Sequence, residues 1–167
     1  MAALVAGCGS SGNPDRHSVR DYVAAIEPLR LGVNKLLDGA DPILDSYREH
    51  RTSAAAAQRA LAGLERRFES YANRVANVRP VPPVLGAAQR AYAHTYVLED
   101  RYLRALIAVL PGRRWDRLPH FEDRQRKVIV AWRATLALEA ARVHVSLPRD
   151  IQIAGRGEIA PSPLGDG

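Results

Sequence analysis

The stretch from Ser18 to Tyr47 reads SVRDYVAAIEPLRLGVNKLLDGADPILDSY. Its apolar residues recur at alternating steps of three and four, which places them along one side of an α-helix. Pro28, and Gly39 with Pro42, are costly inside a helix, yet the register continues past them. The stretch therefore predicts one long kinked helix, or two stacked helices that break at 39–41. The stripe consists of Val19, Tyr22, Ile26, Leu29, Val33, Leu36, Ala40, Ile43 and Tyr47.

Two further signals bound this part of the chain. Ser18 followed by Asp21 is typical of a helix N-terminus, so we expect the first helix to begin there. A second stripe follows Arg51-Thr52-Ser53 and ends at Arg79-Pro80-Val81-Pro82-Pro83, where the prolines remove backbone donors. A second helix is therefore predicted between these signals, with a stripe of Ala57, Leu61, Leu64, Phe68, Tyr71, Val75 and Val78.

The pattern predicts two more helices in the second half of the chain. One runs over 84–110 and is closed by Pro111-Gly112; the other runs over 120–146 and is ended by Pro148. The third stripe is broader than the first two and consists of Leu85, Ala88, Tyr92, Tyr96, Tyr102, Leu106 and Val109. The fourth consists of Phe121, Val128, Trp132, Leu136, Ala140, Val143 and Leu147.

Together these helices predict an all-α fold, an antiparallel up-down four-helix bundle over 18–147 that forms a rod of roughly 40 Å. Residues 148–167 are rich in Pro and Gly, and we expect them to form a flexible tail. Short loops make neighbouring helices antiparallel. The 80–83 connection and the tail should then lie at the N-terminal end, and the turn at 50–51 and the 113–119 loop at the far end.

The composition bounds the class of protein. The chain has 167 residues, 47% of them hydrophobic, which suits one globular domain. Its formal net charge is +6, and of its 24 basic residues only Lys35 and Lys127 are lysines. This charge favours anionic partners such as lipid head groups or wall polymers. A single cysteine allows no intrachain disulfide.

That cysteine stands in Leu4-Val5-Ala6-Gly7-Cys8, which resembles the lipobox of bacterial lipoproteins. The resemblance implies that residues 1–7 are the remnant of a signal peptide and that Cys8 is lipidated. Residues 8–17, with their Gly and Ser, then form a flexible tether to the membrane. The basic region and the apolar run of about 7–15 residues that such a signal needs are incomplete, which we interpret as a truncation or a start codon assigned too far downstream.

The far end of the rod is the first candidate site. Arginine forks suit phosphate and carboxylate groups, and an exposed tryptophan can stack on a ring or a sugar face. We expect this distal cap to bind an anionic envelope ligand, unless Trp115 folds back over the end of the bundle. It consists of His50, Arg51, Arg113, Arg114, Trp115 and Arg117, with Arg48, His120, Phe121 and Arg124 beside them.

The interior offers a second, weaker candidate. When the third helix is aligned antiparallel with the second and the fourth, His94 lies near Glu69 and Glu139. A histidine with carboxylates is what a divalent transition metal needs. The Glu-x-x-His pair of di-iron bundles does not occur in the chain, so we expect no metal and no other cofactor. The tyrosines 71, 92 and 96 could line a ligand groove, although their spacing is typical of core-edge positions.

These observations favour a non-enzymatic protein, because the sequence contains no Gly-x-Ser-x-Gly elbow and no paired Cys-x-x-Cys. We expect an extracytoplasmic, lipid-anchored adaptor or structural protein that docks an envelope protein or another copy of itself. The alternatives are a binding module for an anionic polymer or acidic glycan, and a small-molecule or metal carrier. Nucleic acid suits the charge but not this compartment.

Overall fold

The structure is a computed structural model that describes residues 14–152 and 161–164. The described part is all α-helical and contains no strand, which confirms the predicted fold class. The elements are α1 (Pro14–Leu37), α2 (Asp41–Arg48), α3 (Ala54–Ala76), the short 3₁₀ helix η1 (Pro83–Leu85), α4 (Gly86–Val109), η2 (Leu110–Gly112), η3 (Trp115–Arg117), α5 (Glu122–Arg142) and α6 (Arg149–Gln152).

The first predicted helix is divided into α1 and α2, so the two-helix alternative holds. The chain breaks at Gly39, where tight turns replace the helical ladder: the Gly39 amide donates to the Leu36 carbonyl at 3.2 Å and the Ala40 amide to that of Leu37 at 2.8 Å. Pro28 lies inside α1 without ending it. The apolar stripe nevertheless continues across the break, since Ala40, which lies between the two helices in the sequence, is fully buried.

The start of α1 differs from the prediction. The helix begins at Pro14, upstream of Ser18, so the expected cap at Ser18 and Asp21 is wrong. Proline suits the first turn of a helix because its missing N–H is not needed there. The start of α3 follows the sequence signal instead, since the Ser53 hydroxyl accepts a hydrogen bond from the Ala56 amide at 3.2 Å.

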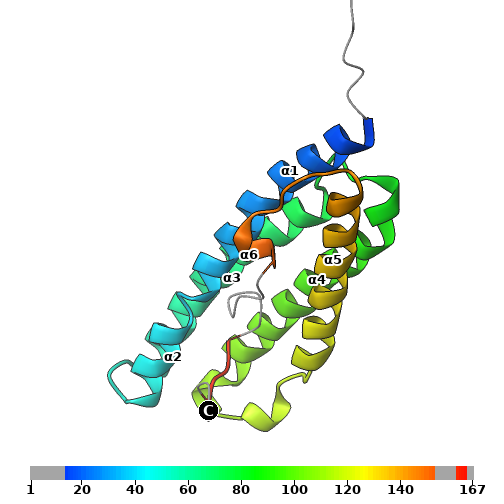
Figure 1. Ribbon diagram of the computed structural model, residues 1–167. Coiled ribbons are helices and arrows are strands. Elements are labelled where there is room, and N and C mark those ends of the chain that lie inside the picture. The colour runs from blue at the N-terminus through cyan, green and yellow to red at the C-terminus, as the bar shows by residue number, and fades with distance from the viewer. Residues whose placement is uncertain (1–13, 153–160, 165–167) are drawn as a thin grey trace, which may run out of the picture.

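The helices α1, α3, α4 and α5 pack in that order around one core. Figure 1 shows α2 continuing the line of α1, and α4 and α5 together on the other side of the bundle. Arg142, at the end of α5, binds Asp15, at the start of α1, with 2.9 Å between Nη2 and Oδ2. At the opposite end, the Tyr47 hydroxyl donates to the Leu110 carbonyl at 2.7 Å. The predicted meeting of the 50–51 turn with the 113–119 loop therefore holds.

The prediction of a tail beyond the bundle needs correction for its described part. After α5 the chain turns back, and α6 lies between α1 and α5 (Figure 1). Ile151 is 1% exposed. The Pro161 carbonyl accepts a hydrogen bond from the Tyr102 hydroxyl at 2.8 Å, and that of Pro163 accepts one from Arg48 at 3.4 Å. We call α6 and residues 161–164 the C-terminal strap.

The strap also changes the expected position of the C-terminal segment. Arg48 is the last residue of α2, so its contact with Pro163 places this part of the chain near the far end of the rod. The tail was expected at the N-terminal end. The physical reason is burial: Ile151, Pro161 and Pro163 are all buried, and the last two accept hydrogen bonds from Tyr102 of α4 and Arg48 of α2.

Candidate interaction surfaces

The interior of the bundle contains a connected polar layer. The Trp132 indole donates from Nε1 to the Tyr22 hydroxyl at 2.8 Å, and that hydroxyl donates to Gln89 Oε1 at 2.5 Å. The Gln89 side chain in turn donates to the Val75 carbonyl at 2.9 Å. Because each of these groups finds its partner within the layer, the layer joins α1, α3, α4 and α5 to one another.

The aromatic rings of the same region are closely packed. Tyr92 stacks on Trp132 with 4.2 Å between ring centroids, and its hydroxyl lies 2.7 Å from that of Tyr96. Tyr96 also stacks on Phe68 at 5.8 Å. Tyr92 and Tyr96 are buried and Tyr71 is half-buried. The groove considered for these three tyrosines is therefore occupied by their own packing.

The weak metal candidates do not come together. His94 is exposed, Glu69 binds Arg104 at 3.1 Å, and Glu139 binds Arg142 at 2.6 Å. Hydrogen bonding to Arg142 lowers the pKa of Glu139. The residues that the structure describes contain no group of three His, Cys, Asp or Glu side chains able to hold a metal ion.

The distal cap does assemble, but its charges are engaged. Arg113 lies over the Tyr47 ring at 5.0 Å and its Nη2 is 3.5 Å from His50 Nδ1. His50 and Arg113 both lie in the left-handed backbone region, with φ of 59° and 51°, where the chain leaves a helical segment. Arg51 binds Glu49 with 2.6 Å between Nε and Oε2.

Other members of the cap are also drawn inward or paired. Arg114 Nε lies 3.5 Å from Asp116 Oδ1. Trp115 is half-buried and packs against the hydrophobic core, as in the alternative in which it covers the end of the bundle. Arg117 is exposed. Carboxylates beside the arginines reduce the positive charge that this end of the rod presents to a ligand.

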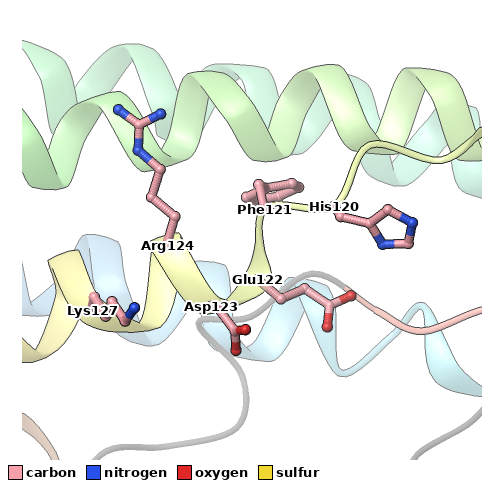
Figure 2. A pocket seen from close by; sticks show the side chains of 6 residues that line it. All are labelled: His120, Phe121, Glu122, Asp123, Arg124 and Lys127. Carbon is pink, nitrogen blue, oxygen red and sulfur yellow. The ribbon is translucent and has the colours of Figure 1, made fainter.

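A cavity of about 440 Å³ lies beside the start of α5, lined by His120, Phe121, Glu122, Asp123, Arg124 and Lys127. Figure 2 shows that the side chains of Glu122, Asp123 and Arg124 point in different directions. The cavity thus carries charges of both signs that do not converge on one point. A bound small molecule needs a few convergent polar groups on an apolar wall, and this arrangement does not provide them.

The outer face of α5 is the clearest candidate surface. The helix buries Ile129, Trp132 and Leu136, and on its opposite side every residue from 130 to 141 is apolar. Val130 is 52% exposed and Leu138 is 75% exposed. Contiguous exposed apolar surface marks an interaction site more often than a solvated face. This α5 face consists of Val130, Ala131, Ala134, Ala137, Leu138 and Ala141.

The sequence analysis missed this face, although a signal for it was present. It assigned one apolar stripe to the fourth helix and named no residue on the opposite side. The segment 128–141 contains alanine, valine or leucine on every side, and a helix that is apolar all round needs partners on more than one side.

No protein-family model, no curated protein and no solved structure matches the chain. In the described part of the chain, no helix combines the length and the apolar character that crossing a membrane requires. Cys8, the signal-peptide remnant over 1–7 and residues 8–13 of the predicted tether lie outside the described residues, whereas residues 14–17 of that tether form the first turn of α1.

Proposed function

We propose that this protein is a non-enzymatic, lipid-anchored envelope component whose helical bundle associates with a second copy of itself through the α5 face. The exposed apolar surface over three turns of α5 carries this proposal. A second copy suits it because the pattern is symmetric about Ala134: Val130 and Leu138 each lie four residues from it, and Ala131 and Ala137 each lie three.

In a two-fold interface residue i meets residue j of the partner and j meets i, and a face that is symmetric about Ala134 fits this arrangement. In an antiparallel pair centred on Ala134, Val130 of one copy meets Leu138 of the other. The small side chain of Ala134 lies on the axis, where it lets the two helices approach closely.

Charges at the ends of the α5 face complement one another in the same arrangement. Arg142 is bound by Asp15 at 2.9 Å and by Glu139 at 2.6 Å, so this cluster places two carboxylates beside one guanidinium. In the antiparallel pair it lies beside Arg126 and Lys127 of the second copy, which are exposed. Such complementarity favours the antiparallel arrangement. In a parallel pair, Lys127 of one copy would lie beside Lys127 of the other, and the two positive charges would repel each other.

Sedimentation velocity of wild type and Ala134→Glu over a range of concentrations tests the association. The wild type should sediment as a dimer and Ala134→Glu as a monomer, because the substitution places two carboxylates on the axis. The matched control is Ala60→Glu on α3, another exposed alanine in a helix. A monomeric wild type, or loss of the dimer in both variants, would contradict the proposed interface.

The anchor is tested separately. When the gene is expressed in bacteria from its true start, the wild type should partition with membranes and Cys8→Ser should not. Equal partitioning of both proteins excludes lipidation at Cys8 and leaves the α5 interface untouched, since the two measurements are independent.

A further inference from the structure

The outer face of α3 carries four exposed arginines: Arg59, Arg66, Arg67 and Arg74. They lie on the side of the helix opposite Leu64 and Phe68, which are buried in the core. At 1.5 Å per residue, they extend over roughly 22 Å along the helix. We call these four residues the arginine stripe.

Acidic side chains do not neutralise the stripe. The acidic residues of α3 are Glu65 and Glu69, which lie toward α4 and bind Arg104 at 2.7 Å and 3.1 Å. Among the described residues no ion pair involves any of the four arginines. Arg67 donates to the Gly63 carbonyl at 3.3 Å and Arg74 lies over the Tyr71 ring at 5.6 Å, and neither contact carries negative charge.

The distal cap differs from the arginine stripe, because carboxylates pair with some of its arginines. There, Arg51 and Arg114 have carboxylates of Glu49 and Asp116 beside them. The arginine stripe thus lacks the neighbouring carboxylates that offset part of the charge at the end of the rod. Like charges on one face of a helix create a positive potential that attracts a polyanion.

The neighbours of the stripe narrow the class of ligand. Ser70, Asn73 and Asn77 are exposed on the same side of α3 and offer hydrogen bonds. The face has no large exposed apolar residue of the kind that an interfacial membrane helix inserts among lipids. It also has no exposed aromatic ring on which a nucleic-acid base could stack, because Tyr71 is half-buried.

We infer that the arginine stripe binds a linear polymer with phosphate groups along its backbone, through contacts to the phosphates alone. Guanidinium forks match phosphate oxygens in bidentate geometry. A straight row of such forks, with amide and hydroxyl groups between them, fits a linear polyanion lying along the helix.

The probe is long-chain inorganic polyphosphate, titrated against the wild-type protein by fluorescence anisotropy at several salt concentrations. The test variant replaces Arg59, Arg66, Arg67 and Arg74 with Gln. The control variant makes the same charge change at Arg16, Arg20, Arg90 and Arg101, which are exposed elsewhere. Thermal unfolding by circular dichroism shows that both variants are folded.

The wild type and the control should bind, and the stripe variant should bind at least tenfold more weakly. The slope of log K against log salt should fall in magnitude by about 3 in the stripe variant, since each lost phosphate contact removes roughly 0.7. Equal weakening of both variants would show that binding follows net charge alone and would overturn the assignment. Preference for phosphatidylglycerol vesicles over polyphosphate at equal phosphate concentration would also overturn it. Tighter binding of single-stranded DNA than of polyphosphate would show that the bases are contacted and would overturn recognition through the phosphates alone.

Discussion

Trp132 lies flat on Tyr92, with an angle of 10° between the two rings and 4.2 Å between their centroids. The stack joins α5 to α4 at the level where the Trp132 indole also donates to Tyr22 of α1. Aromatic packing and hydrogen bonding thus meet in one layer, and the stability of the bundle should depend strongly on the hydroxyl of Tyr22.

Tyr22→Phe tests this dependence. The substitution leaves both Trp132 Nε1 and Gln89 Oε1 without the buried partner that each has now. We expect the free energy of unfolding to fall by about 2–6 kcal/mol, since each of the two unsatisfied buried groups costs about 1–3 kcal/mol. Urea denaturation measures the loss. The control is Tyr71→Phe, which removes a half-buried hydroxyl and should change stability little; an equal loss in both variants would contradict the role of the layer.

Glu27 should make stability depend on pH. Burial and a hydrogen bond to Asp150 raise the pKa of Glu27 to about 7, whereas the pKa of Asp150 is lowered by its bond to Glu27. Arg30 binds both carboxylates, at 2.9 Å and 3.4 Å. The protonated Glu27 thus belongs to the folded state, and its stabilising contribution is complete below the ordinary pKa of 4.5 and lost as pH rises through about 7.

Glu27→Gln keeps an uncharged donor at this position at every pH. The stability of the wild type relative to this variant should therefore fall between pH 5 and pH 8, by about 3 kcal/mol at most. Urea denaturation of both proteins across this range gives the difference, in which titration of the histidines cancels. Parallel stability curves would show that Glu27 ionises normally.

Ile151 should hold the C-terminal strap to the bundle. Its side chain is 1% exposed, and Ile151→Ala should cost about 2–4 kcal/mol of unfolding free energy if the strap unfolds with the rest of the chain. Faster hydrogen exchange confined to the strap, with the helices unchanged, would show that the strap opens on its own. Leu164→Ala is the control, because Leu164 is 72% exposed and its truncation should have no measurable effect.

Gly32 gives a test of the contact between α1 and α3. A Cβ at this position would lie 2.5 Å from the Tyr71 hydroxyl, so the ring must move to admit it. Gly32→Ala should therefore destabilise the wild type, although alanine normally stabilises a helix by about 1 kcal/mol relative to glycine. In a Tyr71→Ala background the same substitution should become stabilising. A double-mutant cycle measured by urea denaturation separates the two effects, and additive changes would rule out the contact.

The helices themselves could be predicted because burial imposes its period on the sequence. Phe68, Trp132 and Leu136 belong to predicted stripes and are at most 1% exposed. The meeting of the 50–51 turn with the 113–119 loop followed from antiparallel topology alone. The exact start of α1 did not follow, since Pro14 and Ser18 are both plausible helix starts and the ion pair between Asp15 and Arg142, which lies in the added turn, joins residues far apart in the sequence.

The buried polar residues, the C-terminal strap and the arginine stripe were harder to predict, each for a different physical reason. Arg30 and Gln89 are polar residues, so a sequence pattern assigns them to the surface, yet both are buried. The strap depends on Ile151 and on the backbone carbonyls of Pro161 and Pro163, and backbone acceptors leave no trace in a sequence. The arginine stripe was hidden because arginines occur throughout the chain, and only the structure shows which of them lack carboxylate neighbours.

The course of the strap also determines how the molecule would respond to force. Pro14 lies at one end of the rod and Pro163 contacts Arg48 near the other. A load applied between the two described ends pulls along the length of the bundle. The contacts at Pro163, Pro161 and Asp150 are then loaded together in shear. In a protein held at its N-terminus and pulled from the opposite end, these contacts would therefore share the load with the packed helices.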